Sequence, residues 1–204
     1  VLTDPALIKG ETTLVTFTFN RAPSGFAEVD VTTIENGLLS AFGVTGDTKV
    51  YEATFTPSVD TEVASSVIAI ANSYTDIAGN PGTVATSAGY SVDTLAPTAT
   101  VVLTDPTLTK GETSLVTFTF NEAPVGFIEA DVTTIEGGLL SAFGVTGDTK
   151  VYEATFTPTD NVVDAVNVIA IANTYSDAAG NPGRVAISAN YTIDTTEGTA
   201  TLAT

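Results

Sequence analysis

The apolar residues of this chain recur at every second position over much of its length. The clearest run spans 15–19, where Val15, Phe17 and Phe19 alternate with threonines, and residues 51–55 repeat the pattern. A period of two is that of a β-strand with one buried face, and no stretch carries a convincing helical period. With the turn residues between the runs, the pattern predicts a loop from Pro57 to Ser66 and seven strands, at about 2–8, 12–20, 28–34, 38–45, 48–56, 67–74 and 83–92.

The same pattern occurs twice along the chain. When residues 1–94 are aligned with 102–195 at a constant offset of 101, 70 of the 94 positions are identical. A period of about a hundred residues is too long for a solenoid unit and fits a whole small domain. The copies differ most between residues 58 and 66, which is typical of a surface loop. Asn36 becomes Gly137 in the second copy, and both residue types tolerate positive φ, so this swap predicts a tight turn.

About seven short strands in a hundred residues are typical of an immunoglobulin-like β-sandwich. We therefore predict an all-β protein of two tandem immunoglobulin-like Greek-key β-sandwiches, about seven strands each, arranged end to end. The predicted domains are residues 1–93 and 98–195, with a short linker, 94–97, that Pro97 stiffens. Residues 196–204 align with the linker and the next first strand, so we expect a following repeat to begin there. The first domain lacks the start of its first strand, and we expect the chain to be part of a longer one.

The charge of the chain is strongly negative. It has 24 acidic and 6 basic residues and no histidine, for a formal net charge of -18. Such a surface repels nucleic-acid phosphates and anionic membranes, so we expect neither as a partner. No apolar run reaches the roughly 18 residues of a membrane span, so we expect no direct membrane insertion. The same surface attracts cations, and its hard oxygen ligands favour calcium over zinc or copper.

Composition also argues against catalysis. The chain has no cysteine and no histidine, so the common nucleophilic triads and dyads cannot be assembled. The acidic pairs lie at turns, and nothing separates the pKa values of two carboxyls as a glycosidase requires. We therefore predict that the chain is not an enzyme.

Five segments of the chain form a set of motifs. They are Lys110-Gly111-Glu112-Thr113, Val116-Thr117-Phe118-Thr119-Phe120-Asn121-Glu122, Gly126-Phe127, Tyr175-Ser176-Asp177-Ala178-Ala179-Gly180-Asn181-Pro182-Gly183 and Asp93-Thr94-Leu95-Ala96-Pro97-Thr98. Together they resemble the bacterial Ig-like domains repeated in large RTX-type, type I-secreted surface adhesins, and the likeness covers nearly the whole chain. The resemblance implies extender stalks on the bacterial cell surface, commonly stiffened by calcium at domain junctions, with neighbouring repeats as partners. One departure is that the first copy has Arg21 where the second has Glu122.

Strand direction predicts where a cation would bind. If the seven predicted strands are lettered A to G in chain order, the B–C and F–G loops lie at the end where the chain enters the sandwich. In the second domain these loops contain Asn121, Glu122, Asp177 and Asn181, which would therefore face Asp93 of the first domain. Carboxylates crowded at a junction repel one another unless a cation intervenes. We expect a calcium ion bound by Asp93, Glu122 and Asp177, with Asn121 or Asn181 contributing. The alternative is that Asp177 and Asn181 only cap a tight turn, with Asp93 ending a strand and Glu122 solvated.

Asp160 and Asp164 form a second candidate cation site. These acids lie four apart without the spacing or the glycine of an EF-hand loop, so the alternative is a solvated loop.

Two functions remain open from the sequence. The first is a non-catalytic, monomeric spacer that projects an adhesive end away from a bacterial surface and is rigidified by calcium. The second is a binding module whose loops grip a carbohydrate or a host protein, which would require an exposed aromatic cluster. The sequence shows no such cluster, since its phenylalanines and tyrosines occupy the alternating positions expected to face inward.

Overall fold

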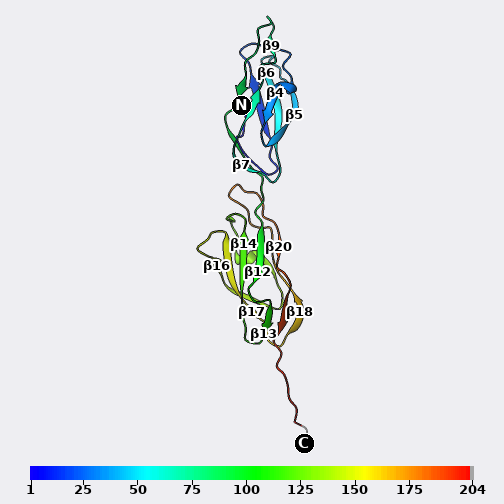
Figure 1. Cartoon of the computed structure of the whole chain (residues 1–204), viewed down its shortest axis with the longest axis vertical. Helices are drawn as coiled ribbons and strands as arrows, with labels where there is room; N and C mark the ends of the chain where they lie inside the picture. Colours follow the sequence, from blue (N-terminus) through cyan, green and yellow to red (C-terminus); the bar gives the residue numbers. More distant parts are fainter. Residues whose placement is uncertain (203–204) are drawn as a thin grey trace. The chain divides into compact units, whose positions relative to one another are not determined.

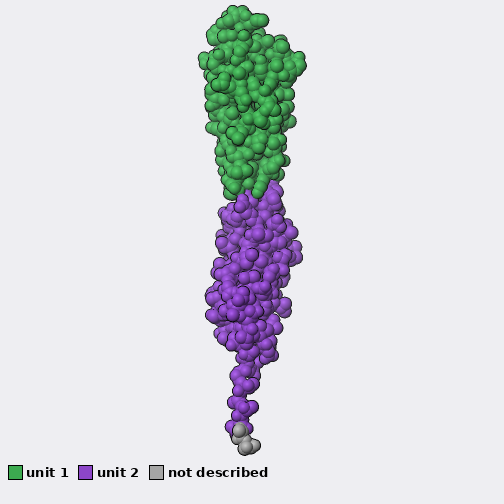
Figure 2. Space-filling view, turned by 90° about the vertical axis from the view of Figure 1, so that its right-hand side faces the viewer, with its two compact units in different colours: residues 1–95 green, residues 96–204 purple. Residues whose placement is uncertain are grey.

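The computed structural model describes residues 1–202 and divides the chain into two compact units. Unit 1 comprises Val1–Leu95, and unit 2 begins at Ala96. Both units are built from β-strands (Figure 1), with one short 3-10 helix each, and Figure 2 distinguishes the two units by colour. Within residues 1–202, no helix has the length and apolar character needed to cross a membrane.

Unit 1 contains three three-stranded sheets and a two-stranded ribbon. Their strand orders are β2-β6-β5, β1-β11-β7, β10-β8-β4 and β3-β9. Only β1 and β11 run parallel among the described pairs of this unit. The elements are β1 (Ala6–Ile8), β2 (Thr13–Thr18), β3 (Pro23–Ser24), η1 (Glu28–Asp30), β4 (Val31–Ile34), β5 (Gly37–Val44), β6 (Val50–Pro57), β7 (Glu62–Ser66), β8 (Ile68–Ile70), β9 (Thr75–Asp76), β10 (Ala85–Thr86) and β11 (Tyr90–Asp93).

Unit 2 repeats this arrangement with one strand more in its largest sheet. The strand orders are β12-β14-β17-β16, β13-β21-β18 and β15-β19-β20. The elements are β12 (Ala99–Leu103), β13 (Thr107–Thr109), β14 (Ser114–Phe120), η2 (Glu129–Asp131), β15 (Val132–Ile135), β16 (Gly138–Val145), β17 (Val151–Pro158), β18 (Val163–Asn167), β19 (Ile169–Ile171), β20 (Ala186–Ile187) and β21 (Tyr191–Asp194). The prediction of an all-β fold with immunoglobulin-like sandwiches in tandem is confirmed.

Each unit has a separate hydrophobic core between its sheet layers. In unit 2, Phe118 and Phe156 of the large sheet face Ile169, Tyr191 and other residues of the smaller sheets. The alternating positions predicted to face inward do so, as the burial pattern of β14 shows. Removing these apolar side chains from water stabilises the fold at roughly 25 cal/mol per Å2, so each unit has the means to hold its own structure.

Two buried tyrosines connect the sheet layers. The hydroxyl of Tyr90 donates a hydrogen bond to the Glu35 carbonyl, and that of Tyr191 donates to the Glu136 carbonyl. Burial, with the nearby Glu35 carboxylate as a second cause, raises the pKa of Tyr90 to about 12. Burial raises the pKa of Tyr191 for the same reason. Both hydroxyls therefore stay protonated donors in the native state.

The structure shortens or divides several of the predicted strands, and it changes the type of element at two places. Glu62–Ser66 lies in the predicted loop yet forms strand β7, which pairs with β11. This strand is largely exposed and held by backbone hydrogen bonds, so its side chains show no alternation. Glu28–Asp30 lies in a predicted strand yet forms η1, because the Asp30 carboxylate accepts a hydrogen bond of 2.8 Å from the Ala27 N–H.

The predicted tight turn at residues 36–37 is confirmed. The turn residue and the residue it contacts both differ between the two copies. Asn36 has φ of 53° and donates a 2.8 Å hydrogen bond to Ser66. In unit 2 the corresponding residues are Gly137, with φ of 69°, and Asn167. The space taken by the Asn36 side chain in unit 1 is occupied by the longer Asn167 in unit 2, because a Cβ on Gly137 would lie 2.8 Å from the Asn167 Oδ1.

Candidate functional site

The loop from Asp177 to Asn181 is closed by its own hydrogen bonds. Asp177 Oδ1 accepts from the Asn181 N–H at 2.8 Å, and Asp177 Oδ2 accepts from Asn181 Nδ2 at 2.7 Å. The Asp177 N–H donates to the Asn181 carbonyl at 3.1 Å, and Gly180 has φ of 92°. Both Asp177 and Asn181 are buried. The Asx-type turn that the sequence offered as one interpretation is therefore present, and each carboxylate oxygen retains a second lone pair.

The B–C loop lies against this F–G loop. Val125 and Ser176 exchange backbone hydrogen bonds of 2.6 and 3.1 Å. Asn121 is occupied in positioning the chain, because its Oδ1 accepts from the Thr98 N–H at 2.6 Å and its carbonyl accepts from Lys150 Nζ at 3.0 Å. Asn121 Nδ2 also donates to Glu122 Oε1 at 3.3 Å. The four predicted residues of unit 2 thus belong to two adjacent loops.

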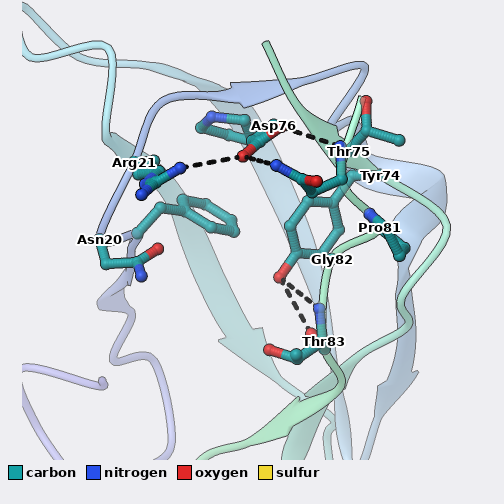
Figure 3. Close-up of a pocket in the computed structure, with 11 residues that line it drawn as sticks. Asn20, Arg21, Tyr74, Thr75, Asp76, Pro81, Gly82 and Thr83 are labelled. Carbon is teal, nitrogen blue, oxygen red and sulfur yellow. Dashed lines mark hydrogen bonds and ion pairs between the residues drawn. The ribbon is translucent and has the colours of Figure 1, made fainter. Parts of the chain in front are cut away.

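The corresponding loop of unit 1 contains an ion pair. Arg21 Nη1 lies 3.4 Å from Asp76 Oδ2, and Figure 3 shows the two side chains at the edge of a pocket of about 320 Å3. Hydrogen bonds from the side chain and backbone of Asn80 are the main cause that lowers the pKa of Asp76, and Arg21 contributes. Because Arg21 and Asp76 correspond to Glu122 and Asp177, the second copy replaces the guanidinium of this pair with a carboxylate.

The remaining predicted residues lie elsewhere in their units. Asp93 ends β11 in unit 1, is half-buried, and is aligned with Glu62 of β7. In unit 2, Asp160 lies in an exposed turn. Asp164 lies in β18, where its Oδ1 accepts a 3.0 Å hydrogen bond from the Val166 N–H. Asp164 is therefore a strand residue rather than a loop residue.

The chemistry available at these loops is that of hard oxygen ligands. Within residues 1–202, no three acidic side chains are gathered closely enough to hold a metal ion. A calcium ion would then draw on one or two carboxylates together with amide and backbone carbonyl oxygens, a mixture that suits its flexible coordination. Shortly after this loop, unit 2 has Arg184 where unit 1 has Thr83, so the sequence charge near the loop also differs between the copies.

The sequence reasoning missed the role of the segment that enters unit 2. The Pro97 carbonyl accepts a 3.1 Å hydrogen bond from the Arg184 N–H, and Thr98 exchanges hydrogen bonds with Asn121. This segment therefore covers the F–G loop before it continues into β12.

These features define tandem immunoglobulin-like sandwiches whose two copies share the turn closed by Asp76 and Asn80 or by Asp177 and Asn181, and differ in the charge beside it. The model of the family described as bacterial Ig-like domain matches residues 1–92 and 93–193. The chain therefore belongs to the bacterial Ig-like domain family. None of the curated proteins matches the chain.

Several solved structures match the chain at low identity and low TM-score. An Escherichia coli adhesin, FdeC, shares 16% identity with a TM-score of 0.38, over 95% of this chain and 62% of that one. The I9–I11 tandem of titin shares 8% with a TM-score of 0.37, over 96% and 64%. Murine CEACAM1b shares 10% with a TM-score of 0.32, over 96% and 98%. The chain thus spans somewhat less than two thirds of the first two structures.

Proposed function

We propose that this chain is a non-catalytic extender segment of a bacterial cell-surface adhesin. The observation that carries the proposal is the repetition itself. Two units with 70 of 94 aligned positions identical each contain their own core, and the chain belongs to the bacterial Ig-like family. Near-identical tandem sandwiches add length without adding different sites, which is what a spacer outside the cell requires.

Calcium is the second part of the proposal. We place the ion at the loops of Glu122 and Asp177, with Asp93, Asn121 and Asn181 as the further ligands expected from the sequence. Support comes from unit 1, where the positions equivalent to Glu122 and Asp177 are close enough for the 3.4 Å contact of Arg21 with Asp76. In unit 1 a guanidinium lies beside the aspartate, and in unit 2 a calcium ion would take that role beside two carboxylates.

Thermal unfolding in calcium and in chelator tests the cation. A ligand at 100 times its dissociation constant stabilises the folded state by about 2.7 kcal/mol. The variant Glu122→Arg copies the residue of unit 1 and is expected to abolish the calcium-dependent rise in melting temperature. The reciprocal variant Arg21→Glu gives unit 1 the two carboxylates of unit 2 and is expected to increase the calcium-dependent rise rather than abolish it. An unchanged melting temperature of the unmodified chain in millimolar calcium would refute the calcium site and leave the spacer role standing.

Small-angle scattering tests the spacer. We expect the scattering profile of the chain to give a large maximum dimension that substitutions in the loops do not change. We expect this dimension to be better defined in calcium than in chelator. A compact particle in both conditions would contradict the extender function.

The alternative, a carbohydrate- or protein-binding module, finds less support. The large apolar side chains exposed within residues 1–202 are all aliphatic and include no phenylalanine or tyrosine. Carbohydrate and protein ligands are commonly gripped by exposed aromatic residues. A glycan array with the whole chain tests this alternative, and specific binding would favour it over the spacer.

A further inference from the structure

Each unit contains one parallel pair of strands, formed by one of its early strands and its last strand. Strand β13 pairs with β21 in unit 2 and β1 pairs with β11 in unit 1, whereas the other strand pairs described within residues 1–202 are antiparallel. At the centre of the pair in unit 2, Leu108 is aligned with Ile193, and both side chains are buried in the core. The pair therefore joins the part of the chain that enters the unit to the part that leaves it.

The direction of the two strands decides how this pair responds to tension. Tension along the chain pulls β13 from the side of Thr107 and pulls β21 from the side of Asp194. Asp194 is aligned with Thr109, so the two pulled residues lie at opposite ends of the pair. The pull therefore slides one strand along the other and loads the hydrogen bonds between them together. An antiparallel hairpin pulled at its two adjacent ends would instead lose its hydrogen bonds one after another.

The side of the pair where the chain enters is reinforced in both units. Strand β12, which precedes β13, is held by β14 of the large sheet, and once it has come away the whole load falls on β13. Directly ahead of β13, the Pro106 carbonyl accepts a 2.8 Å hydrogen bond from the Thr192 N–H of β21. In unit 1 the Pro5 carbonyl accepts from the Ser91 N–H at the same distance. Because a proline ring fixes φ, the chain ahead of the pair has little freedom to turn away.

A buried threonine anchors the side of the pair where the chain leaves. Thr195 directly follows β21 and is 0% exposed. Its N–H donates to the Val162 carbonyl at 2.8 Å, and its hydroxyl accepts from the Val162 N–H at 2.9 Å. The same hydroxyl donates to the Thr159 carbonyl at 2.7 Å. These hydrogen bonds tie the end of β21 to the loop between β17 and β18, so a pull on Thr196 reaches this anchor before it reaches the parallel pair.

Unit 1 has the same anchor, although the loop that it holds has a different sequence. Thr94 is 2% exposed, its N–H donates to the Thr61 carbonyl at 2.7 Å, and its hydroxyl accepts from the Thr61 N–H at 3.0 Å. The hydroxyl also donates to the Ser58 carbonyl at 2.7 Å. This loop belongs to the segment 58–66, where the two copies differ most. Because the anchor uses backbone groups of the loop, the loop side chains differ between the copies while the threonine is the same.

We propose that each unit has a tension-bearing element, formed by its parallel pair and the buried threonine that follows it. The element is β13 and β21 with Thr195 in unit 2, and β1 and β11 with Thr94 in unit 1. This inference rests on the proposed extender function, because a segment between a cell and a distant contact is pulled along its chain. The parallel pair resists the pull by shear, and the threonine prevents the last strand from being peeled away from the adjoining loop.

Single-molecule force spectroscopy with two pulling geometries tests this element. The chain has no cysteine, so introduced cysteines alone define where the handles attach. Cysteines at Thr98 and Thr196 load unit 2 in shear, whereas cysteines at Thr109 and Thr196 pull the parallel pair apart from one end. All three positions are exposed, so the fold tolerates the substitutions.

The expected result is a difference in the force at which unit 2 unfolds. In chelator, where a bound cation contributes nothing, we expect the shear geometry to need a force at least about twofold higher, because forced unfolding is governed by the unfolding barrier and this barrier depends on the direction of the pull. Equal forces in the two geometries would overturn the proposal.

The variant Thr195→Val tests the threonine in the shear geometry. Valine keeps the shape of the side chain and leaves the Val162 N–H without its acceptor. The matched control Thr174→Val removes a threonine hydroxyl of unit 2 that bonds to Asp131, outside the parallel pair. Urea unfolding gives the free energy that each variant loses. We expect Thr195→Val to lower the unfolding force more than Thr174→Val for the same loss of free energy, and a fall in force that only follows the loss of free energy in both variants would overturn the role of the anchor.

Failure of this proposal can be distinguished from failure of the extender function. If scattering shows an extended chain and the two pulling geometries give equal forces, the tension-bearing element is wrong and the spacer stands. A compact particle in scattering would contradict the extender function even where the two forces differ.

Discussion

Replacing Asp177 by alanine separates the structural role of the F–G loop from its proposed role in binding calcium. The substitution removes both carboxylate oxygens that accept hydrogen bonds from Asn181, at 2.8 and 2.7 Å. Asp177 and Asn181 are 2% and 0% exposed, so water does not readily take the place of the lost acceptor. The equivalent pair of unit 1, Asp76 and Asn80, makes the same two contacts at a more exposed position and provides a matched control.

The expected magnitude follows from these contacts. A hydrogen bond to a charged group contributes about 1.5–3 kcal/mol, and a buried donor that loses its acceptor adds a desolvation cost. Two such bonds are lost in Asp177→Ala, so we expect the free energy of unfolding of unit 2 to fall by about 3–5 kcal/mol. For a domain of about a hundred residues, this corresponds to a lowering of the melting temperature by at least about 12 °C. Asp76→Ala should cost unit 1 less, because water reaches Asn80.

Hydrogen exchange read by mass spectrometry suits this test, because it reports the two units separately. In chelator, exchange of the amides of unit 2 should accelerate in Asp177→Ala, while those of unit 1 stay unchanged. If Asp177 also binds calcium, the variant additionally loses the protection that calcium confers on the unmodified chain. Equal destabilisation by Asp177→Ala and Asp76→Ala would refute the argument from burial, and no destabilisation in chelator would refute the structural role.

Three further predictions concern the cores of the two units. Gly137→Asn should destabilise unit 2 by about 1–3 kcal/mol, because its Cβ would lie 2.8 Å from Asn167 Oδ1. Adding Asn167→Ser should restore most of this loss, as measured by urea unfolding in a double-mutant cycle. Additive effects of the two substitutions would contradict the pairing. Gly138→Ala should lower the melting temperature of unit 2, because its Cβ would lie 2.4 Å from a backbone oxygen of the neighbouring strand. Tyr90 has a folded pKa of about 12, above the ordinary value of 10, so its contribution to stability is complete below pH 10 and is lost as the pH rises through 12. An absorbance titration should contain a tyrosine ionisation with a midpoint near pH 12, and completion of all tyrosine ionisation below pH 11 would contradict this.

Local sequence was sufficient to predict those elements whose own side chains show the pattern of burial or the backbone conformation. The alternation in residues 114–120 predicted β14, and the Asn36 to Gly137 swap predicted the positive-φ turn, because each depends on the properties of nearby residues. Strand β7 escaped prediction because its pairing with β11 uses backbone groups that every residue has. The hydrogen bonds between Asp177 and Asn181 followed from their spacing in a turn, whereas their burial did not.

The sequence by itself determined the strands, the duplication and the acidic, non-nucleophilic chemistry of this protein, because these depend on periodicity and composition. Tertiary structure alone decided which positions of the two copies differ in environment. Arg21 and Glu122 are a simple substitution in an alignment, and only the fold shows that the first of them lies 3.4 Å from an aspartate. A contact between residues distant along the chain, such as this one, leaves no periodic signal in the sequence.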